Sequence, residues 1–153
     1  MRDSVTVHMA ASPEAIWAVV SDVTDVGRFS PETFGAEWLD GATGPAVGVR
    51  FRGHVNRNGW GLKYSTECRI IACEPGREFA FTVYAPGNLG LNTWRYQLVP
   101  AGDGTDVTES FELSRILPMR LYWLLAGWTR GRTNRRGMLE TLERVKRFVE
   151  NPS

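Results

Sequence analysis

The chain has 153 residues and a formal net charge of +1, from 18 Lys and Arg against 17 Asp and Glu. This length predicts a single domain over residues 1–153. The near-neutral charge excludes the overall basic field of a dedicated nucleic-acid-binding protein. Six Trp and seven Phe exceed what a minimal core requires and suggest a hydrophobic pocket, with a purely structural role as the alternative.

Three features bear on location and cofactors. Residues 1–10 lack the basic start and apolar run of a secretory signal. Residues 116–128 form the richest apolar segment, but Pro, Arg and Gly interrupt it before the roughly 20 residues that a membrane span needs. Cys68 and Cys73 make neither a disulfide framework nor a zinc site. We therefore expect a cytoplasmic protein with reduced thiols and with neither metal nor other cofactor.

The N-terminal segment predicts one strand followed by two short helices. Val5, Val7 and Met9 alternate with polar residues, which is typical of a strand with one buried face. Ser12-Pro13-Glu14 then supplies a capping hydroxyl, a proline at the first helical position and an early acid. Residues 22–31 carry apolar side chains at helix-like spacing among turn residues, and predict a second short helix or a turn.

The middle of the chain predicts an antiparallel meander. Turn-forming residues separate six alternating segments, and Asn58-Gly59 is a strong hairpin signal. The six expected strands cover residues 34–40, 49–57, 60–72, 78–84, 92–99 and 106–114. With the opening strand, they make a seven-stranded sheet.

The C-terminal segment predicts one long helix after Pro118, because apolar residues recur there at steps of three and four. A helix of about thirty residues extends roughly 45 Å and crosses a whole small domain. Residues 131–137 interrupt its apolar stripe with Gly, Arg, Thr and Asn. The helix therefore either kinks at this point or faces something other than a packed core.

Five short segments, in this order along the chain, carry a family resemblance. They are Ser12-Pro13-Glu14 with Trp17; Val47-Gly48-Val49-Arg50-Phe51-Arg52-Gly53; Glu74-Pro75-Gly76 before Phe79 and Phe81; Trp94-Arg95-Tyr96; and Gly104-Thr105 before Val107-Thr108-Glu109. The sequence resembles the START-like (SRPBCC) superfamily, specifically its bacterial polyketide cyclase/dehydrase-type branch. The resemblance implies an α+β helix-grip fold, in which a curved antiparallel sheet wraps a long C-terminal helix.

The resemblance also implies a cavity between the sheet and the long helix. Such a cavity takes a hydrophobic small molecule, such as a lipid, sterol or polyketide. Some relatives cyclise or dehydrate polyketides and many only bind or carry, so the fold alone does not assign an activity. The branch has no catalytic motif that transfers residue by residue onto this chain, and any activity has to be argued from local chemistry.

Strand alternation brings large aromatic side chains to the apolar face of the sheet. Apolar walls with few polar anchors are typical of a ligand pocket, although each aromatic residue could equally fill the core. The ligand-binding candidates on the strands are Phe51, Trp60, Tyr64, Phe79, Phe81, Trp94, Tyr96 and Phe111.

Glu109 is the candidate catalytic residue, because alternation places its carboxyl group on the apolar face. A carboxyl group there would have a raised pKa or need a cationic partner such as Arg132 or Arg135, and either state suits proton transfer with a carbonyl ligand. The alternative is a shifted register that turns Glu109 to solvent and Thr108 with Ser110 inward.

The long helix adds further candidates. Leu121, Leu125 and Trp128 could contact the ligand, and residues 130–150 carry +4 while the remainder carries −3. This asymmetry could attract an anionic ligand or a membrane surface, although a solvated helix face is the more common explanation.

Three functions follow from these observations. We expect intracellular binding or carriage of a hydrophobic small molecule, lipid or polyketide-like. The first alternative is a polyketide cyclase or dehydratase acting by general acid/base chemistry. The second is an interaction protein that docks through the aromatic start of the long helix. The sequence does not specify an oligomeric state.

Overall fold

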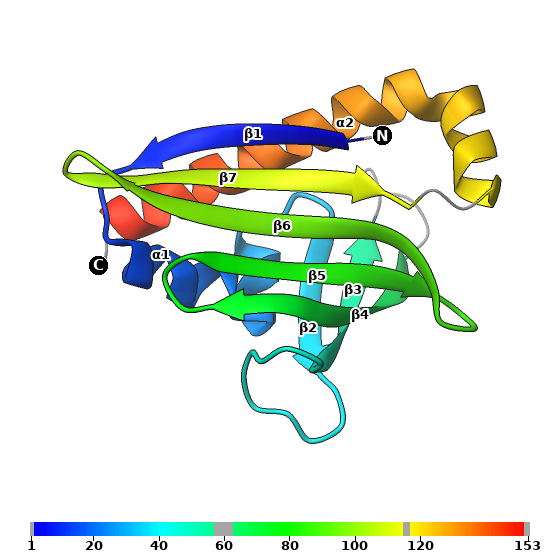
Figure 1. The fold of residues 1–153 in the computed structure, drawn as a ribbon, viewed down its shortest axis with the longest axis horizontal. Helices are drawn as coiled ribbons and strands as arrows, with labels where there is room; N and C mark the ends of the chain where they lie inside the picture. The colour runs from blue at the N-terminus through cyan, green and yellow to red at the C-terminus, as the bar shows by residue number, and fades with distance from the viewer. Residues whose placement is uncertain (1, 57–62, 115–116, 152–153) are drawn as a thin grey trace.

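The computed structural model describes residues 2–56, 63–114 and 117–151, and for residues 117–133 it describes the helical backbone alone. The described strands pair antiparallel in the order β1-β7-β6-β5-β4-β3-β2 (Figure 1). The elements are β1 (Arg2–Met9), α1 (Pro13–Val20), the 3₁₀ helix η1 (Val23–Arg28), β2 (Thr33–Trp38), β3 (Arg50–Asn56), β4 (Lys63–Glu74), β5 (Glu78–Ala85), β6 (Leu89–Ala101), β7 (Gly104–Leu113) and α2 (Leu117–Glu150).

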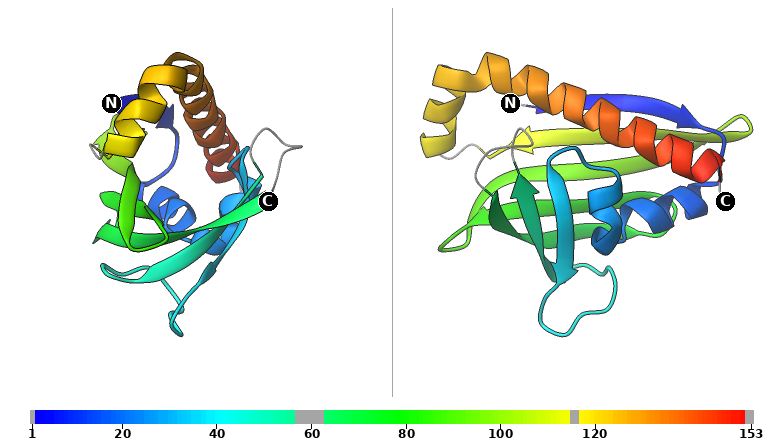
Figure 2. Two further views of the ribbon diagram at one scale, coloured as in Figure 1. Left: turned by 90° about the vertical axis from the view of Figure 1, so that its right-hand side faces the viewer. Right: turned by 180° about the vertical axis from the view of Figure 1, so that it is seen from behind.

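The predicted helix-grip fold is confirmed. Figure 2 shows the curved sheet wrapping around α2, which runs along its concave side. The expected strands are all present, and β6 extends beyond the expected residues 92–99 at both ends. The Asn58-Gly59 hairpin and Trp60 lie outside the described residues.

Local sequence explains how the two short helices reach the sheet. The Ser12 hydroxyl accepts from the Ala15 amide at 3.2 Å and begins α1. The Trp17 indole N–H then donates to the Glu78 carbonyl of β5 at 2.9 Å, which ties α1 to the sheet. In η1, a Cβ at Gly27 would collide with the Phe34 carbonyl of β2, so only glycine permits this close approach.

The C-terminal part of α2 packs tightly against one end of the sheet. Leu142 and Val145 are buried together with Met9 of β1, Ile16 of α1 and Val107 of β7. This end of the helix is therefore part of the hydrophobic core. Nearer its start, α2 changes direction before it crosses the sheet (Figure 1). Within the described part of the chain, no helix has both the length and the apolar character to cross a bilayer.

Candidate functional site

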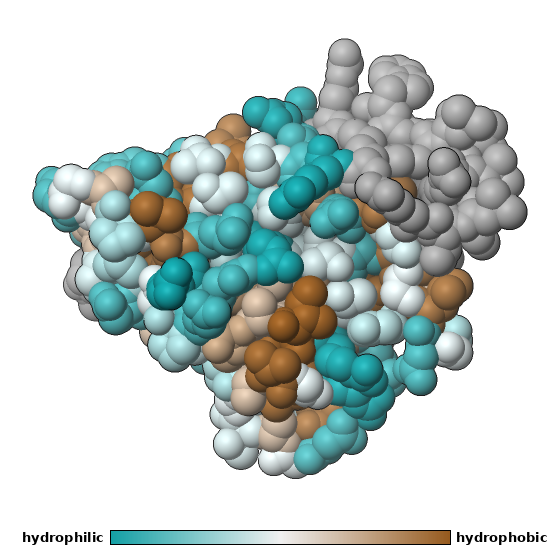
Figure 3. Space-filling model, in the orientation of Figure 1, coloured by the Kyte–Doolittle hydropathy of each residue, from teal (hydrophilic) through white to brown (hydrophobic). Residues whose placement is uncertain are grey.

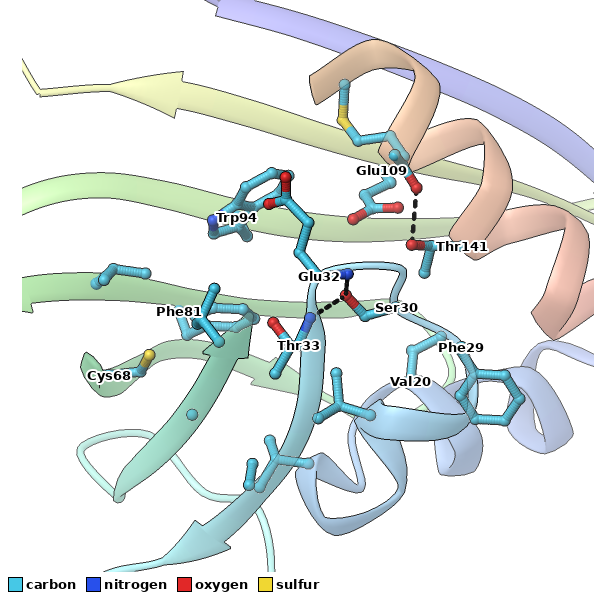
Figure 4. Close-up of a pocket in the computed structure, with 18 of the residues that line it drawn as sticks. Val20, Phe29, Ser30, Glu32, Thr33, Cys68, Phe81, Trp94, Glu109 and Thr141 are labelled. Carbon is cyan, nitrogen blue, oxygen red and sulfur yellow. Dashed lines mark hydrogen bonds between the residues drawn. The ribbon is translucent and has the colours of Figure 1, made fainter. Parts of the chain in front are cut away.

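A cavity of about 210 Å³ lies between the inner face of the sheet and α2. Strands β2 to β7 contribute to its wall, and α1, η1 and the segment before β2 line it from the side (Figure 4). Most of its lining side chains are apolar. Among them are Val23, Phe51, Val83, Phe81, Trp94 and Met138.

Aromatic rings form one continuous part of this wall. The Phe51 and Phe81 rings meet edge to face, with centroids 5.1 Å apart, and join β3 to β5. The Trp94 ring on β6 packs against Phe111, with centroids 4.9 Å apart. Rigid aromatic contacts hold this part of the wall in place and present apolar surface to a ligand.

The structure brings six of the predicted site residues together. Phe51, Tyr64, Phe81, Trp94, Tyr96 and Glu109 all line the cavity. Phe79 and Phe111 are also buried, but they do not line it and instead support the wall from within the core.

Most of the remaining predicted residues lie outside the described part of the chain. They are Trp60 and the side chains of Leu121, Leu125, Trp128 and Arg132. The predicted membrane contact and the docking face at the start of the helix therefore stay predictions.

Arg135 is placed away from the cavity. Its guanidinium pairs with the Asp3 carboxylate at 2.8 Å, at the side of β1, and its side chain is 62% exposed. Arg135 directly follows the buried Asn134, and neighbouring helix positions point in different directions. The sequence alone therefore did not show which of the two faces the cavity.

Glu109 faces inward, as the alternation predicted, and its side chain is 4% exposed. Tyr96 lies directly opposite Glu109 in the β6–β7 ladder. The Tyr96 hydroxyl donates to Oε1 of Glu109 at 3.1 Å, and Oε2 has no hydrogen-bond partner among the described residues. The alternative register with Glu109 in solvent is therefore excluded.

Burial controls the protonation of this pair. Burial raises the pKa of Glu109 to about 8, and the hydrogen bond from Tyr96 opposes this shift only in part. Burial and the neighbouring Glu109 also raise the pKa of Tyr96 well above its usual value. Both groups are consequently neutral near pH 7 and able to donate hydrogen bonds.

Several residues that line the cavity were not predicted from the sequence. Residues of α1, η1 and the turn before β2 supply one side of it. The helix-like spacing of Val23, Val26 and Phe29 was a signal for this face, since all three line the cavity. Asn134 and Thr141 face it from α2, and both are nearly buried. The signal for Asn134 was the polar interruption of the helix at residues 131–137, of which Asn134 and Gly137 line the cavity.

The outer face of the sheet has a different character. It is mostly hydrophilic, with a small apolar area (Figure 3). Arg50 pairs with Asp40 at 3.0 Å, and His54 contacts Ser65 and Glu37, as expected of a solvated surface. Among the described residues, no group of three or more His, Cys, Asp or Glu could hold a metal ion.

The chain matches one known family over nearly its whole length. The family model described as "Polyketide cyclase / dehydrase and lipid transport" matches residues 2–150. The chain belongs to this family. The predicted resemblance to the START-like superfamily is thereby confirmed, and the fold is shared by many solved structures. No curated protein sequence matches this member significantly.

Three solved structures illustrate the relationship of this polyketide cyclase/dehydrase family member to others. The Polyketide_cyc-like protein Cgl2372 from Corynebacterium glutamicum is 28% identical, with 97% of this chain and 91% of that chain covered and a TM-score of 0.60. Protein CV1439 from Chromobacterium violaceum is 19% identical, with 99% of each chain covered and a TM-score of 0.68. The Aha1 dimer from Colwellia psychrerythraea is 12% identical, with 98% and 96% covered and a TM-score of 0.59.

Proposed function

We propose that this protein binds a hydrophobic small molecule, lipid or polyketide-like, in the cavity and carries it without chemical change. The observation that carries the proposal is an apolar, aromatic-walled cavity with a few polar anchors between the sheet and α2. The family description, which includes lipid transport, supports the same function. Two free cysteines, Cys68 and Cys73, support a reducing compartment, and the cytoplasm is part of the proposal.

Carriage is favoured over catalysis because few side chains of the cavity wall could act as a base or a nucleophile. Among the described residues that line the cavity there is no His, Lys or Arg. The Cys68 thiol is also a poor nucleophile, because burial raises its pKa to about 12. A binding protein needs no more than apolar contact and a few orienting polar groups.

Native mass spectrometry of freshly purified protein tests the proposal directly. We expect a co-purifying apolar molecule whose mass adds to that of the chain, and Trp94→Ala should reduce its occupancy. Phe34→Ala provides the control, because Phe34 is 53% exposed and does not line the cavity. If no molecule co-purifies and the protein takes up no added apolar probe, the proposal is contradicted.

A second candidate function rests on the Tyr96–Glu109 pair. A neutral, buried carboxylic acid beside a tyrosine can give a proton to a bound carbonyl compound, as a cyclase or dehydratase requires. In that case Glu109→Gln should retain ligand affinity but lower turnover of a polyketide-like substrate by about a hundredfold or more. A carrier has no turnover for the substitution to remove.

A further inference from the structure

Glu109 contributes to the cavity lining a carboxyl group whose hydrogen-bonding capacity is only half used. Glu109 is 4% exposed, and its Oε1 accepts from Tyr96 at 3.1 Å. Oε2 is buried and lacks a hydrogen-bond partner among the described residues. Figure 4 shows the carboxyl group at the cavity wall, between Trp94 and Thr141. A buried polar atom without a partner costs free energy that a ligand could recover.

Burial, with no compensating cation in the described lining, keeps the carboxyl group of Glu109 neutral. Tyr96 faces it from β6, and the described part of α2 lines the cavity with the uncharged Asn134 and Thr141. The lining also contains the carboxyl groups of Asp22 and Glu32. No cation of the described lining compensates a charge on Glu109, and burial raises its pKa to about 8.

The hydrogen bond with Tyr96 decides where the proton of this acid lies. Because Oε1 accepts from the Tyr96 hydroxyl, the carboxyl proton belongs on Oε2, where it is a donor without an acceptor. The Thr141 hydroxyl cannot act as a second free donor, because it donates to the Gly137 carbonyl at 2.8 Å. Oε2 of Glu109 is therefore suited to bind an acceptor atom of the ligand.

We propose that the cavity selects apolar molecules with one neutral hydrogen-bond acceptor, such as a ketone, ester or lactone carbonyl, which accepts from Oε2 of protonated Glu109. This inference rests on the binding function proposed above and names the ligand class for it. An anionic head group, such as a fatty-acid carboxylate, is disfavoured. Asp22 and Glu32 already bring acidic groups to the lining, and its described part contains no cation.

Matched naphthalene probes test this selection. We would measure the affinities of 2-acetylnaphthalene, 2-ethylnaphthalene and 2-naphthoate at pH 6.5 by calorimetry, for the wild type and for Glu109→Leu. The ketone and ethyl probes have nearly the same shape, so their affinity ratio reports the acceptor. We expect this ratio to be about threefold to tenfold higher in the wild type than in Glu109→Leu, as one hydrogen bond predicts. Naphthoate should bind the wild type most weakly.

Protonation provides the second readout. At pH 9.5 the ketone-to-ethyl ratio of the wild type should fall to that of Glu109→Leu, because a carboxylate cannot donate. Glu109→Gln should keep a raised ratio at both pH values, since its amide N–H donates without titrating. The ethyl probe controls for other effects of pH on the protein.

The outcomes separate this inference from the proposed function. If both neutral probes bind and their ratio is the same in the wild type and Glu109→Leu, the carbonyl anchor is wrong and binding stands. If neither probe binds the wild type, the proposed function fails and the anchor fails with it. Should Glu109→Leu not fold, as judged by circular dichroism, a wild-type ratio that is unchanged between pH 6.5 and 9.5 overturns the anchor.

Discussion

The two ends of the space under α2 have the same sheet on one side and the same helix on the other, yet one is filled and the other is hollow. At the filled end, Leu142 of α2 is completely buried against β1, β7 and α1. At the hollow end, α2 presents the small or polar residues Asn134, Gly137 and Thr141 to the cavity, together with Met138. Small and polar helix residues leave space where branched apolar residues would close it. The small and polar residues of α2 therefore help to keep this end of the fold hollow.

The largest expected effect concerns the filled end. Leu142→Ala should lower the free energy of unfolding by about 2–5 kcal/mol, because the cavity that it creates cannot collapse in a packed core. Arg147→Ala, on the exposed side of the same helix, should change it by less than about 0.5 kcal/mol. Urea denaturation measures both, and equal midpoints would contradict the distinction between the two faces of α2.

The next effect concerns the acid at the hollow end. Folded Glu109 has a pKa of about 8, against 4.5 as the ordinary value, so between these values the folded chain holds a proton that the unfolded chain has lost. Stability should therefore fall as pH rises from 5 to 8, by up to about 1.4 kcal/mol per pH unit. Urea denaturation at both pH values should show a smaller fall in Glu109→Gln. Parallel pH profiles would show that Glu109 is ionised in the folded state.

A third prediction concerns the aromatic wall at the hollow end. Trp94→Ala and Phe81→Ala should each weaken the binding of a hydrophobic fluorescent probe by about tenfold, which corresponds to about 1.4 kcal/mol of lost apolar contact. Phe34→Ala should leave binding unchanged, because this side chain points away from the cavity. Equal titration curves for all three variants would place the probe elsewhere on the protein.

The smallest effect sharpens the comparison at a single glycine. A Cβ added at Gly137 would meet Pro31 Cγ at 3.8 Å, an ordinary contact. Gly137→Ala should therefore stabilise the protein by about 0.5–1 kcal/mol through helix propensity. Gly27→Ala is the matched control, and it should destabilise, because its Cβ would collide with the Phe34 carbonyl. Thermal unfolding of the two variants measures the difference, and destabilisation by Gly137→Ala would show that this part of the cavity wall is closed.

Strand alternation was sufficient to predict much of the site. It placed Phe51, Phe81, Trp94 and Glu109 on the inner face, because a strand side chain can point to only two sides. It could not predict that Tyr96 lies opposite Glu109, since cross-strand register depends on the turn that joins β6 to β7.

The helical side of the cavity was harder to predict. Residues of η1 and of the turn before β2 line it. The helix-like spacing of Val23, Val26 and Phe29 indicated one common apolar face but not that this face lines a cavity. On α2, the sequence showed that residues 131–137 were unusual but not which of them faced inward. Asn134 lines the cavity, whereas the adjacent Arg135 pairs with Asp3 at the surface, because successive helix positions point about 100° apart.

The most direct test of ligand binding in this cavity is a ¹H–¹⁵N NMR titration with 2-acetylnaphthalene. We expect the largest shift changes at cavity residues, namely the amides of Gly53, Thr66 and Gly137 and the indole N–H of Trp94. Met9 and Leu142, in the filled end of the fold, should move little. Saturable changes centred on the outer face, at residues such as Arg50 and Ile71, would contradict ligand binding in this cavity, and so would a spectrum that does not change.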